Sequence, residues 1–480
     1  MTADDILEYA IKSPDRTALV HNGMRYSYRD FALRLGHALG ELAKLRLPPG
    51  ALAAVKLDNL LDAWITVLAL QRLGLDTVAL RTLDRLGPLD LGPLSLIVAD
   101  EDAAAVSQAL PAGRQARYLP LPAGSYSGPA HLSADPWPEP CERAGGNILV
   151  TSGTTGRWKK VLITAADLAG GQERRRQLFD LTSTSVAGIH NLGLWTSLGY
   201  CAPPVQWSMG ASVVIEQRPK AASLFAASGL THVFALPGQI AELLAEREGA
   251  FPRRDGLEVF VGGGPLPLAH ARLVKARLTN KVSTYVAASE VGPWARTRFN
   301  TDEDLRWHRI HPTCEVEVVG PDGAPAPPGR EGLVRIRPVF EHQGYLGDPE
   351  ASAEFYRDGF WYPGDLAILR DDGRICLNGR VTEVINVRGQ KIATTPLERA
   401  LADRLGVEGV CIFSAPDAEG AEALHVAIAS PAPISRSELE TAARATLSGF
   451  PAAHFHRVDA LPYSPAGKVS RQALKQQILG

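Results

Sequence analysis

One stretch of this sequence has the composition of a phosphate-binding loop. It consists of Thr151, Ser152, Gly153, Thr154, Thr155, Gly156, Arg157, Trp158, Lys159 and Lys160. Glycines let backbone N–H groups approach an anion, hydroxyls donate further hydrogen bonds, and lysine supplies positive charge. The apolar residues 147–150 predict a short buried strand before the loop. We therefore expect the loop at a strand's carboxyl end, where open α/β sheets bind ligands.

This loop does not follow the Walker A pattern. Walker A requires a second glycine, then lysine and a hydroxyl residue, at set positions after the first glycine. At the position of that second glycine, Gly153 and Gly156 are followed by Trp158 and Val161. A Ser/Thr/Gly run by itself is equally typical of a flexible linker, so further motifs must decide.

Further motifs occur in order along the chain. They are the run Gly262, Gly263 and Gly264, the segment Val286 to Glu290, the segment 344–350, the triplet 364–366 around Asp365, the pair Gly379 and Arg380, and the segment 462–471 with Lys468. In order and spacing, this set resembles the adenylate-forming superfamily, which groups acyl-CoA synthetases, peptide-synthetase adenylation domains and luciferases. The resemblance extends over nearly the whole chain.

The resemblance implies an α/β fold in two domains. Residues 1–380 would form a large N-terminal domain of layered sheets and helices that holds ATP and the acid. Residues 381–480 would form a smaller, mobile α+β lid that carries Lys468, with Thr382 at the hinge. Alternating patterns point independently to α/β architecture: a hairpin at 17–28 around Asn22-Gly23, a helix from residue 33, a strand at 51–57 and a helix from residue 60. Residues 83–93, rich in Leu, Gly and Pro, look shorter than the family's corresponding stretch.

The family's reaction has two halves, which ATP and Mg²⁺ support. A carboxylate attacks the α-phosphate of ATP to give an acyl-adenylate and pyrophosphate, and a thiol then attacks the acyl carbon and releases AMP. By resemblance, Lys468 bridges the carboxylate and the α-phosphate, and Glu290 coordinates Mg²⁺, which takes its other ligands largely from water and phosphate. Without the neighbouring motif residues, the alternative for Lys468 is a solvated lysine, and the alternative for Glu290 is a helix-capping or surface acid.

The resemblance also assigns residues to the nucleotide. The phosphates are assigned to Thr151, Ser152, Gly153, Thr154, Thr155, Gly156 and Lys159. The rest of the nucleotide is assigned to Gly262, Gly263, Gly264, Ser289, Asp365 and Arg380. Asp365 would accept hydrogen bonds from the ribose hydroxyls, and Arg380 would also reach the nucleotide. Ordinary turns are the alternative explanation for the glycine run and for Asp365.

Several residues depart from the family pattern. Val286 stands where the family has a tyrosine stacked on adenine, so we expect that contact to be lost unless Tyr285 supplies it. Thr382 stands where the hinge usually has Asp or Lys. Trp158 replaces a proline and Lys160 a glycine, which predicts a phosphate loop that is less mobile or differently charged. None of these changes removes a predicted catalytic residue.

The predicted substrate is an aryl or acyl carboxylic acid without an α-amino group. His190 lies in a segment similar to the acyl pocket of acid ligases and is predicted to contact the substrate, with a satisfied core histidine as the equal alternative. No aspartate stands where amino-acid-activating domains hold the α-ammonium group, which would be costly to bury unpaired.

The thiol acceptor is expected to be a separate molecule. Only residues 472–480 follow Arg471, so we expect coenzyme A or the phosphopantetheine of an acyl carrier protein in trans, as in stand-alone ligases of secondary metabolism. A non-catalytic nucleotide-binding relative, suggested by Val286 and Thr382, and an amino-acid-activating stand-alone adenylation domain stay open. Nothing in the sequence favours a luciferase-like oxidation.

Composition excludes other broad classes. Fifty basic and 52 acidic side chains give a net charge of −2, which argues against nucleic-acid or membrane-surface binding. The sequence contains neither a signal-peptide core nor an apolar run of membrane-spanning length, so we expect a cytoplasmic protein without membrane insertion. Five scattered cysteines are expected to be reduced and buried.

Overall fold

The chain divides into two compact units. The computed structural model describes residues 2–111, 113–126, 137–152, 158–227, 229–247, 249–339, 344–387, 390–407, 409–416, 422–430, 432–450, 453–463 and 469–479. The first unit comprises Met1–Val233, Ala288–Gly292 and Pro338–Tyr356, and the second comprises Phe234–Ala287, Pro293–Arg337 and Arg357–Gly480. The domain boundary expected between residues 380 and 381 concerns a hinge and stays a prediction.

The first unit contains a six-stranded sheet and a second group of strands. The six-stranded sheet has the order β6-β5-β3-β4-β7-β8, with every neighbouring pair parallel except β7 and β8. In the second group β1, β10 and β9 are parallel neighbours, and β2 pairs antiparallel with β1. The strands are β1 (Thr17–His21), β2 (Met24–Ser27), β3 (Leu52–Lys56), β4 (Asp76–Ala79), β5 (Leu96–Ala99), β6 (Arg117–Pro120), β7 (Asn147–Ser152), β8 (Trp158–Ile163), β9 (Val186–His190) and β10 (Ser212–Glu216).

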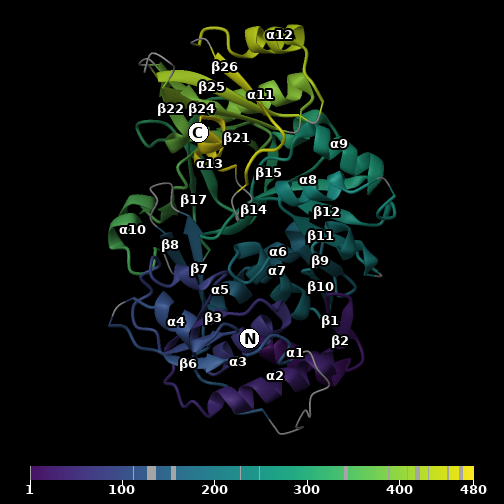
Figure 1. Cartoon of the computed structure of the whole chain (residues 1–480), viewed down its shortest axis with the longest axis vertical. Coiled ribbons are helices and arrows are strands. Elements are labelled where there is room, and N and C mark those ends of the chain that lie inside the picture. Colours follow the sequence, from purple (N-terminus) through teal and green to yellow (C-terminus); the bar gives the residue numbers. More distant parts are fainter. Residues whose placement is uncertain are drawn as a thin grey trace. The chain divides into compact units, whose positions relative to one another are not determined.

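The helices of the first unit connect and flank these strands. They are α1 (Thr2–Lys12), α2 (Tyr28–Ala43), α3 (Leu60–Arg72), α4 (Ala103–Ala109), α5 (Ala165–Gly170), α6 (Gln172–Leu178), α7 (Ser197–Trp207) and α10 (Pro349–Phe355), with 3-10 helices η1 (Leu83–Arg85) and η2 (Ala221–Ala226). Helix α2 packs against both α1 and α3 (Figure 1). The alternation of strands and helices in this region agrees with the sequence pattern.

The N-terminal hairpin confirms a prediction and corrects one boundary. Asn22 and Gly23 have φ angles of 49° and 86°, the left-handed pair that a type I′ turn requires. The second strand ends at Ser27 rather than Tyr28, because Ser27 caps helix α2. Its hydroxyl accepts a hydrogen bond from the Asp30 amide, and the Asp30 carboxylate accepts one from the Ser27 amide.

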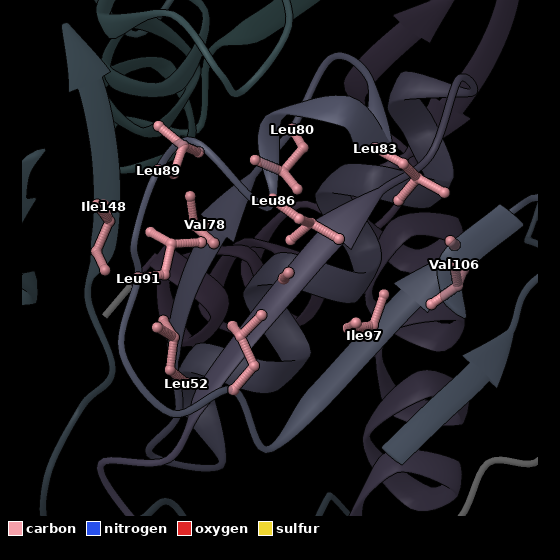
Figure 2. Packing of buried hydrophobic residues seen from close by; sticks show 13 residues of the cluster. Leu52, Val78, Leu80, Leu83, Leu86, Leu89, Leu91, Ile97, Val106 and Ile148 are labelled. Carbon is pink, nitrogen blue, oxygen red and sulfur yellow. The ribbon is translucent and has the colours of Figure 1, made fainter. Parts of the chain in front are cut away.

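Residues 83–93 pack their leucines against the six-stranded sheet. Figure 2 shows these side chains among residues of β3, β4, β5 and β7; the labelled members are Leu52, Val78, Leu80, Leu83, Leu86, Leu89, Leu91, Ile97, Val106 and Ile148. Full burial of one leucine stabilises a fold by about 1.5–3 kcal/mol. This short segment is therefore held to the sheet although most of it has no regular secondary structure.

The second unit begins with parallel strands and continues in antiparallel order. Its strands β12-β13-β14-β15-β21-β20-β17-β19 are successive neighbours, with β12 and β13 parallel. They are β12 (Glu258–Val261), β13 (Lys281–Ala288), β14 (Gly292–Arg298), β15 (His308–Ile310), β17 (Glu331–Ile336), β19 (Phe360–Trp361), β20 (Asp365–Leu369) and β21 (Arg374–Arg380), with β16 (Val316–Val319) paired to β17. The helices are α8 (Pro237–Ala245), α9 (Leu268–Arg277) and the 3-10 helix η3 (Asp302–Leu305). Strands β11 (His232–Ala235) and β18 (Tyr356–Arg357) cross the division between the units, as do β13 and β14, whose end residues Ala288 and Gly292 belong to the first unit.

The last hundred residues form apolar clusters of their own. Their elements are the 3-10 helix η4 (Val381–Glu383), the hairpin β22 (Val384–Val387) and β23 (Gln390–Ala393), α11 (Thr394–Leu405), β24 (Gly409–Pro416), β25 (Glu422–Ala429), α12 (Arg436–Thr446), β26 (Ala453–Val458) and α13 (Arg471–Leu479). Leu401 of α11 and Ala442 of α12 share a cluster with β24 and β25, whereas Leu474 of α13 shares another with Phe413 (Figure 1). Helices thus cover both faces of the β24-β25-β26 sheet.

Two compositional expectations can be compared with these coordinates. Among the described residues, no helix is both long enough and apolar enough to cross a membrane. None of the five cysteines, all of which lie within the described residues, is in a disulfide bond; Cys201, Cys376 and Cys411 are buried, while Cys141 and Cys314 are half-buried. The expectation of buried cysteines holds for three of the five.

Candidate active site

The predicted phosphate loop connects two antiparallel strands. Strands β7 and β8 pair with Thr151 opposite Lys159 and Ser152 opposite Trp158, and β7 also pairs parallel with β4. The loop therefore starts at the carboxyl end of a buried strand, as the sequence predicts. The predicted residues Gly153, Thr154, Thr155 and Gly156 lie outside the described residues, as does Arg157.

The two lysines at the start of β8 have different partners. The Lys159 ammonium lies 3.0 Å from the centroid of the Phe355 ring and 4.9 Å from that of Tyr345. The Lys160 ammonium donates to the carbonyl oxygens of Leu89, at 3.0 Å, and Asp90, at 2.7 Å. Successive side chains of a strand point to opposite faces, so only Lys159 shares a face with these rings.

The replacements Trp158 and Lys160 both contact residues 83–93. The Arg85 guanidinium lies 4.4 Å from the centroid of the Trp158 ring, an attractive cation–π arrangement. Lys160 binds two carbonyls of the same segment. Both departures from the family pattern thus have structural partners, and the charge of Lys160 is directed at backbone carbonyls.

Glu290 lies in the turn between β13 and β14, within the first unit. Its side chain is buried, and its Oε1 accepts a hydrogen bond of 3.0 Å from the Tyr345 hydroxyl. Arg174 of α6 donates to the carbonyl of Val291 at 2.6 Å and so holds the turn. Burial, and secondarily the charge of Glu290, raises the pKa of the nearby Tyr356 hydroxyl.

A single carboxylate such as that of Glu290 is the type and number of protein ligand that magnesium often takes at nucleotide sites. Within the described ranges, no group of three or more His, Cys, Asp or Glu side chains is arranged to hold a metal ion. Magnesium at nucleotide sites usually takes one or two carboxylates, with water and phosphate oxygens completing its shell. Glu290 is therefore a suitable ligand if phosphate supplies further oxygens. Ser289 precedes it in the same turn and is half-buried.

Asp365 and Arg380 lie directly opposite each other in the second unit. Asp365 begins β20 and Arg380 ends β21, and these antiparallel strands pair the two residues in register. The Arg380 Nε donates to Asp365 Oδ1 at 2.9 Å. The hairpin explains the spacing of the two motifs, because residues at its open end are distant in sequence and adjacent in space.

Local packing and backbone conformation require glycine at two positions of the run 262–264. A Cβ on Gly262 would lie 2.3 Å from Cζ of Tyr285, and Gly263 has a φ of 83°. Tyr285 is buried beneath Gly262, whereas Val286, the next residue of β13, points to the other face. Tyr285 and Val286 therefore point to opposite faces of β13. Gly264 completes the bend after β12.

His190 is buried at the end of β9. Its Nε2 lies 2.8 Å from the Arg218 carbonyl oxygen and 3.3 Å from Asn191 Nδ2. Glu216, at the end of the adjacent β10, binds the Arg218 guanidinium. These bonds fit a satisfied core histidine as well as a residue lining a pocket, so a role in substrate binding stays a prediction.

Two further predicted residues lie at the edges of what the structure describes. Lys468 lies outside the described residues, and Thr382 follows β21 in the 3-10 helix η4, with its side chain likewise outside. Arg471 follows Lys468 closely and is anchored, because its Nη2 lies 2.9 Å from Glu398 Oε1 and 3.0 Å from Thr394 Oγ1. The segment with Lys468 thus leads into a fixed helix start.

The sequence did not assign roles to Tyr345, Phe355 or Arg174. Tyr345 belongs to the motif 344–350, so its position in a motif was a signal that could have drawn attention to it. Phe355 and Arg174 lie outside every motif, and only the folded chain brings them to Lys159 and to the Glu290 turn.

Comparison with known proteins is consistent with these motifs. The family model described as AMP-binding enzyme matches residues 7–346. A salicyl-AMP ligase / salicyl-S-ArCP synthetase of Mycobacterium tuberculosis is 27% identical over 99% of this chain and 91% of its own length. A feruloyl-CoA synthase of Amycolatopsis is 27% identical over 97% of this chain and 96% of its own.

Solved structures confirm the α/β fold class. The amide bond synthetase McbA from Marinactinospora thermotolerans superimposes with a TM-score of 0.81 over 99% of both chains, at 21% identity. Together with the family match over most of the chain, this fold places the motifs in their expected context. The chain belongs to the AMP-binding enzymes, the adenylate-forming superfamily that its motifs resemble.

Proposed function

We propose that the chain uses ATP to convert a carboxylic acid into an acyl-adenylate and then transfers the acyl group to a pantetheine thiol, releasing AMP. The observation that carries this proposal is that Glu290 and Lys159 both contact the side chain of Tyr345, Glu290 at its hydroxyl and Lys159 at its ring. An acid from one predicted motif and a lysine from another, distant in sequence, thereby converge in one part of the first unit. A metal-binding acid near a cation suits a triphosphate.

The residues divide the chemistry between them. Glu290 holds Mg²⁺ against phosphate oxygens, and Lys159 with the hydroxyls of the loop holds the phosphates. Asp365 and Arg380, paired in register, hold the ribose side of the nucleotide. Lys468 places positive charge between the carboxylate and the α-phosphate, where charge builds up as the new bond forms.

An aryl acid is the preferred substrate class. Relatives that match nearly the whole chain are named for salicylate and ferulate, both aromatic acids without an α-amino group. The sequence has no aspartate at the position that pairs an α-ammonium group, and a buried ammonium without a partner would be strongly unfavourable. Coenzyme A and a carrier-protein phosphopantetheine are both candidate acceptors, since these two relatives are named for one of each.

ATP–pyrophosphate exchange tests the proposal directly. The purified chain is incubated with Mg²⁺, ATP and labelled pyrophosphate, and with salicylate, ferulate, short-chain acids, long-chain acids or amino acids in parallel. Exchange that depends on an aryl or acyl acid is expected. Exchange with amino acids alone would overturn the assigned substrate class, and no exchange with any acid would favour a non-catalytic relative. Each acid that supports exchange is then incubated with the protein, ATP and either coenzyme A or a phosphopantetheinylated carrier protein. The thioester product is identified by mass spectrometry.

A further inference from the structure

Tyr345 contacts two predicted functional residues through different parts of its side chain. Its hydroxyl donates to Glu290 Oε1 at 3.0 Å, and the Lys159 ammonium lies 4.9 Å from the centroid of its ring. Tyr345 is 5% exposed, so both contacts are shielded from water. In a shielded site, a hydrogen bond to a carboxylate is stronger than the same bond in solvent.

The position of Tyr345 is fixed before any ligand arrives. Its backbone N–H donates to Ser352 Oγ at 2.8 Å, and that hydroxyl donates to the Asp348 carbonyl at 2.6 Å. The neighbouring Leu346 amide donates to the Lys160 carbonyl at 2.8 Å, which links the motif 344–350 to strand β8. These bonds fix the backbone from two sides.

Two aromatic neighbours fix the ring itself. Phe355 lies edge-on to Tyr345 at a centroid distance of 6.0 Å, and Tyr356 does so at 5.6 Å. Edge-to-face arrangements are favourable because the positive edge of one ring meets the negative face of another. The hydroxyl of Tyr345 therefore reaches Glu290 from a rigid support.

We infer that Tyr345 is a positioning residue that orients the Glu290 carboxylate for Mg²⁺ and holds Lys159 beside it. This inference rests on the proposed function, in which Glu290 is the metal-binding acid. A hydrogen bond to one carboxylate oxygen restricts rotation of the whole group, so the carboxylate does not have to be ordered when the metal binds. Partners of this kind behind a metal ligand typically change metal affinity by about 10- to 100-fold when removed.

Substitution of the hydroxyl alone tests the inference. Tyr345→Phe keeps the ring, its edge-on neighbours and the contact with Lys159, and removes only the donor to Glu290. We expect the Mg²⁺ concentration for half-maximal pyrophosphate exchange to rise about 10-fold or more, while the rate at saturating Mg²⁺ and the KM for the acid change little. Tyr345→Leu also removes the ring and should in addition raise the KM for ATP, because Lys159 loses an aromatic contact.

Tyr356→Phe is the matched control. It also removes a phenol hydroxyl near Glu290, from a half-buried tyrosine, but within the described part of the chain that hydroxyl makes no hydrogen bond to the carboxylate. The Mg²⁺ dependence of this variant should equal that of the wild type. Circular dichroism and melting temperature establish that all three variants are folded.

A binding measurement separates this inference from the proposed function. Mn²⁺ replaces Mg²⁺, and its binding in the presence of α,β-methylene ATP, which is not cleaved at that bond, is followed by electron paramagnetic resonance. Weaker Mn²⁺ binding to Tyr345→Phe, but not to Tyr356→Phe, supports the inference even if no acid yet tested gives exchange. Equal Mn²⁺ affinity in the wild type and both variants overturns it, as does a wild type that binds no Mn²⁺ with the nucleotide.

Discussion

Lys160 offers the sharpest test of how the phosphate motif is built, because its place in the predicted phosphate-binding stretch suggests phosphate and its contacts suggest a structural role. The ammonium donates to the carbonyl oxygens of Leu89 and Asp90 at 3.0 and 2.7 Å. Lys160→Met keeps an apolar stem and removes the charged donor. We expect the variant to lose stability around residues 83–93 and to keep its affinity for ATP.

The size of the loss follows from the two acceptors. A hydrogen bond from a charged donor contributes about 1.5–3 kcal/mol, and a buried carbonyl left without a donor costs about 1–3 kcal/mol. Leu89 is buried, so its carbonyl would lose its donor in a dry environment, whereas Asp90 is exposed and can be rehydrated. Dehydration of the ammonium already offsets part of the gain in the wild type. We therefore expect a net loss of about 1–3 kcal/mol.

Hydrogen exchange and ATP kinetics together make the assay. Because the chain has two compact units, a single global unfolding transition is not assured, and exchange of individual amides reports local stability. Amides of residues 83–93 and of β8 should exchange roughly 5- to 150-fold faster in Lys160→Met, as a loss of about 1–3 kcal/mol implies. The KM for ATP in pyrophosphate exchange should stay within about twofold of the wild-type value, because the removed charge faces carbonyls.

The adjacent lysine supplies the control. Lys159→Met is the same substitution one residue earlier, on the face of Tyr345 and Phe355. It should raise the KM for ATP and leave exchange at residues 83–93 unchanged. A Lys160→Met variant with raised KM and unaltered exchange would refute the structural role and assign Lys160 to phosphate.

Four further outcomes are expected. Lys468→Ala should abolish pyrophosphate exchange but largely retain thioester formation from a supplied acyl-adenylate, because the family's lid presents another face for the second half-reaction; equal loss of both activities would contradict this. Val286→Tyr should lower the KM for ATP by about fivefold or more, because stacking on a base contributes about 1–3 kcal/mol, while Val286→Leu should not; an unchanged KM would mean that adenine is held elsewhere. Gly262→Ala should lower stability by about 1–3 kcal/mol, since the new Cβ would lie 2.3 Å from Tyr285 Cζ; an unchanged melting temperature would argue against that packing. Burial, and secondarily a nearby guanidinium, lowers the pKa of His308 to about 4 from 6.5. The neutral ring is therefore favoured in the fold, and stability should fall by up to about 3 kcal/mol as pH drops from about 6.5 to about 4; His308→Gln should flatten this part of a pH titration of unfolding.

Features set by neighbouring residues could be predicted from the sequence. The turn at Asn22 and Gly23 needs two left-handed residues, and only a few residue types adopt that conformation cheaply. The strand before the phosphate loop follows from a run of apolar residues. The apolar pattern from residue 33 predicts too late a start for α2, because the helix begins at Tyr28, directly after the Ser27–Asp30 capping box.

The structure brings some of the predicted site residues together, and physical reasons explain which contacts the sequence could indicate. The resemblance assigns Asp365 and Arg380 to the nucleotide, and an antiparallel hairpin explains how residues at this spacing lie opposite each other. The contact of Tyr345 with Glu290 spans 55 residues, and no local pattern encodes which buried hydroxyl meets which carboxylate. Such contacts are decided by packing of whole elements, here α10 against β8 and the Glu290 turn.

The replacements Trp158 and Lys160 have a common structural explanation, because both side chains contact residues 83–93. A glycine at position 160 could not supply a donor to the carbonyls of residues 83–93, and a proline at position 158 could not offer a ring face to Arg85. Those residues form a short connection whose leucines already bury against the sheet, but leucines satisfy no backbone carbonyl. A lysine from the adjacent strand meets that need. Its charge is then directed at the carbonyls, so the proposed function leaves the phosphates to Lys159 and to the residues of the loop itself.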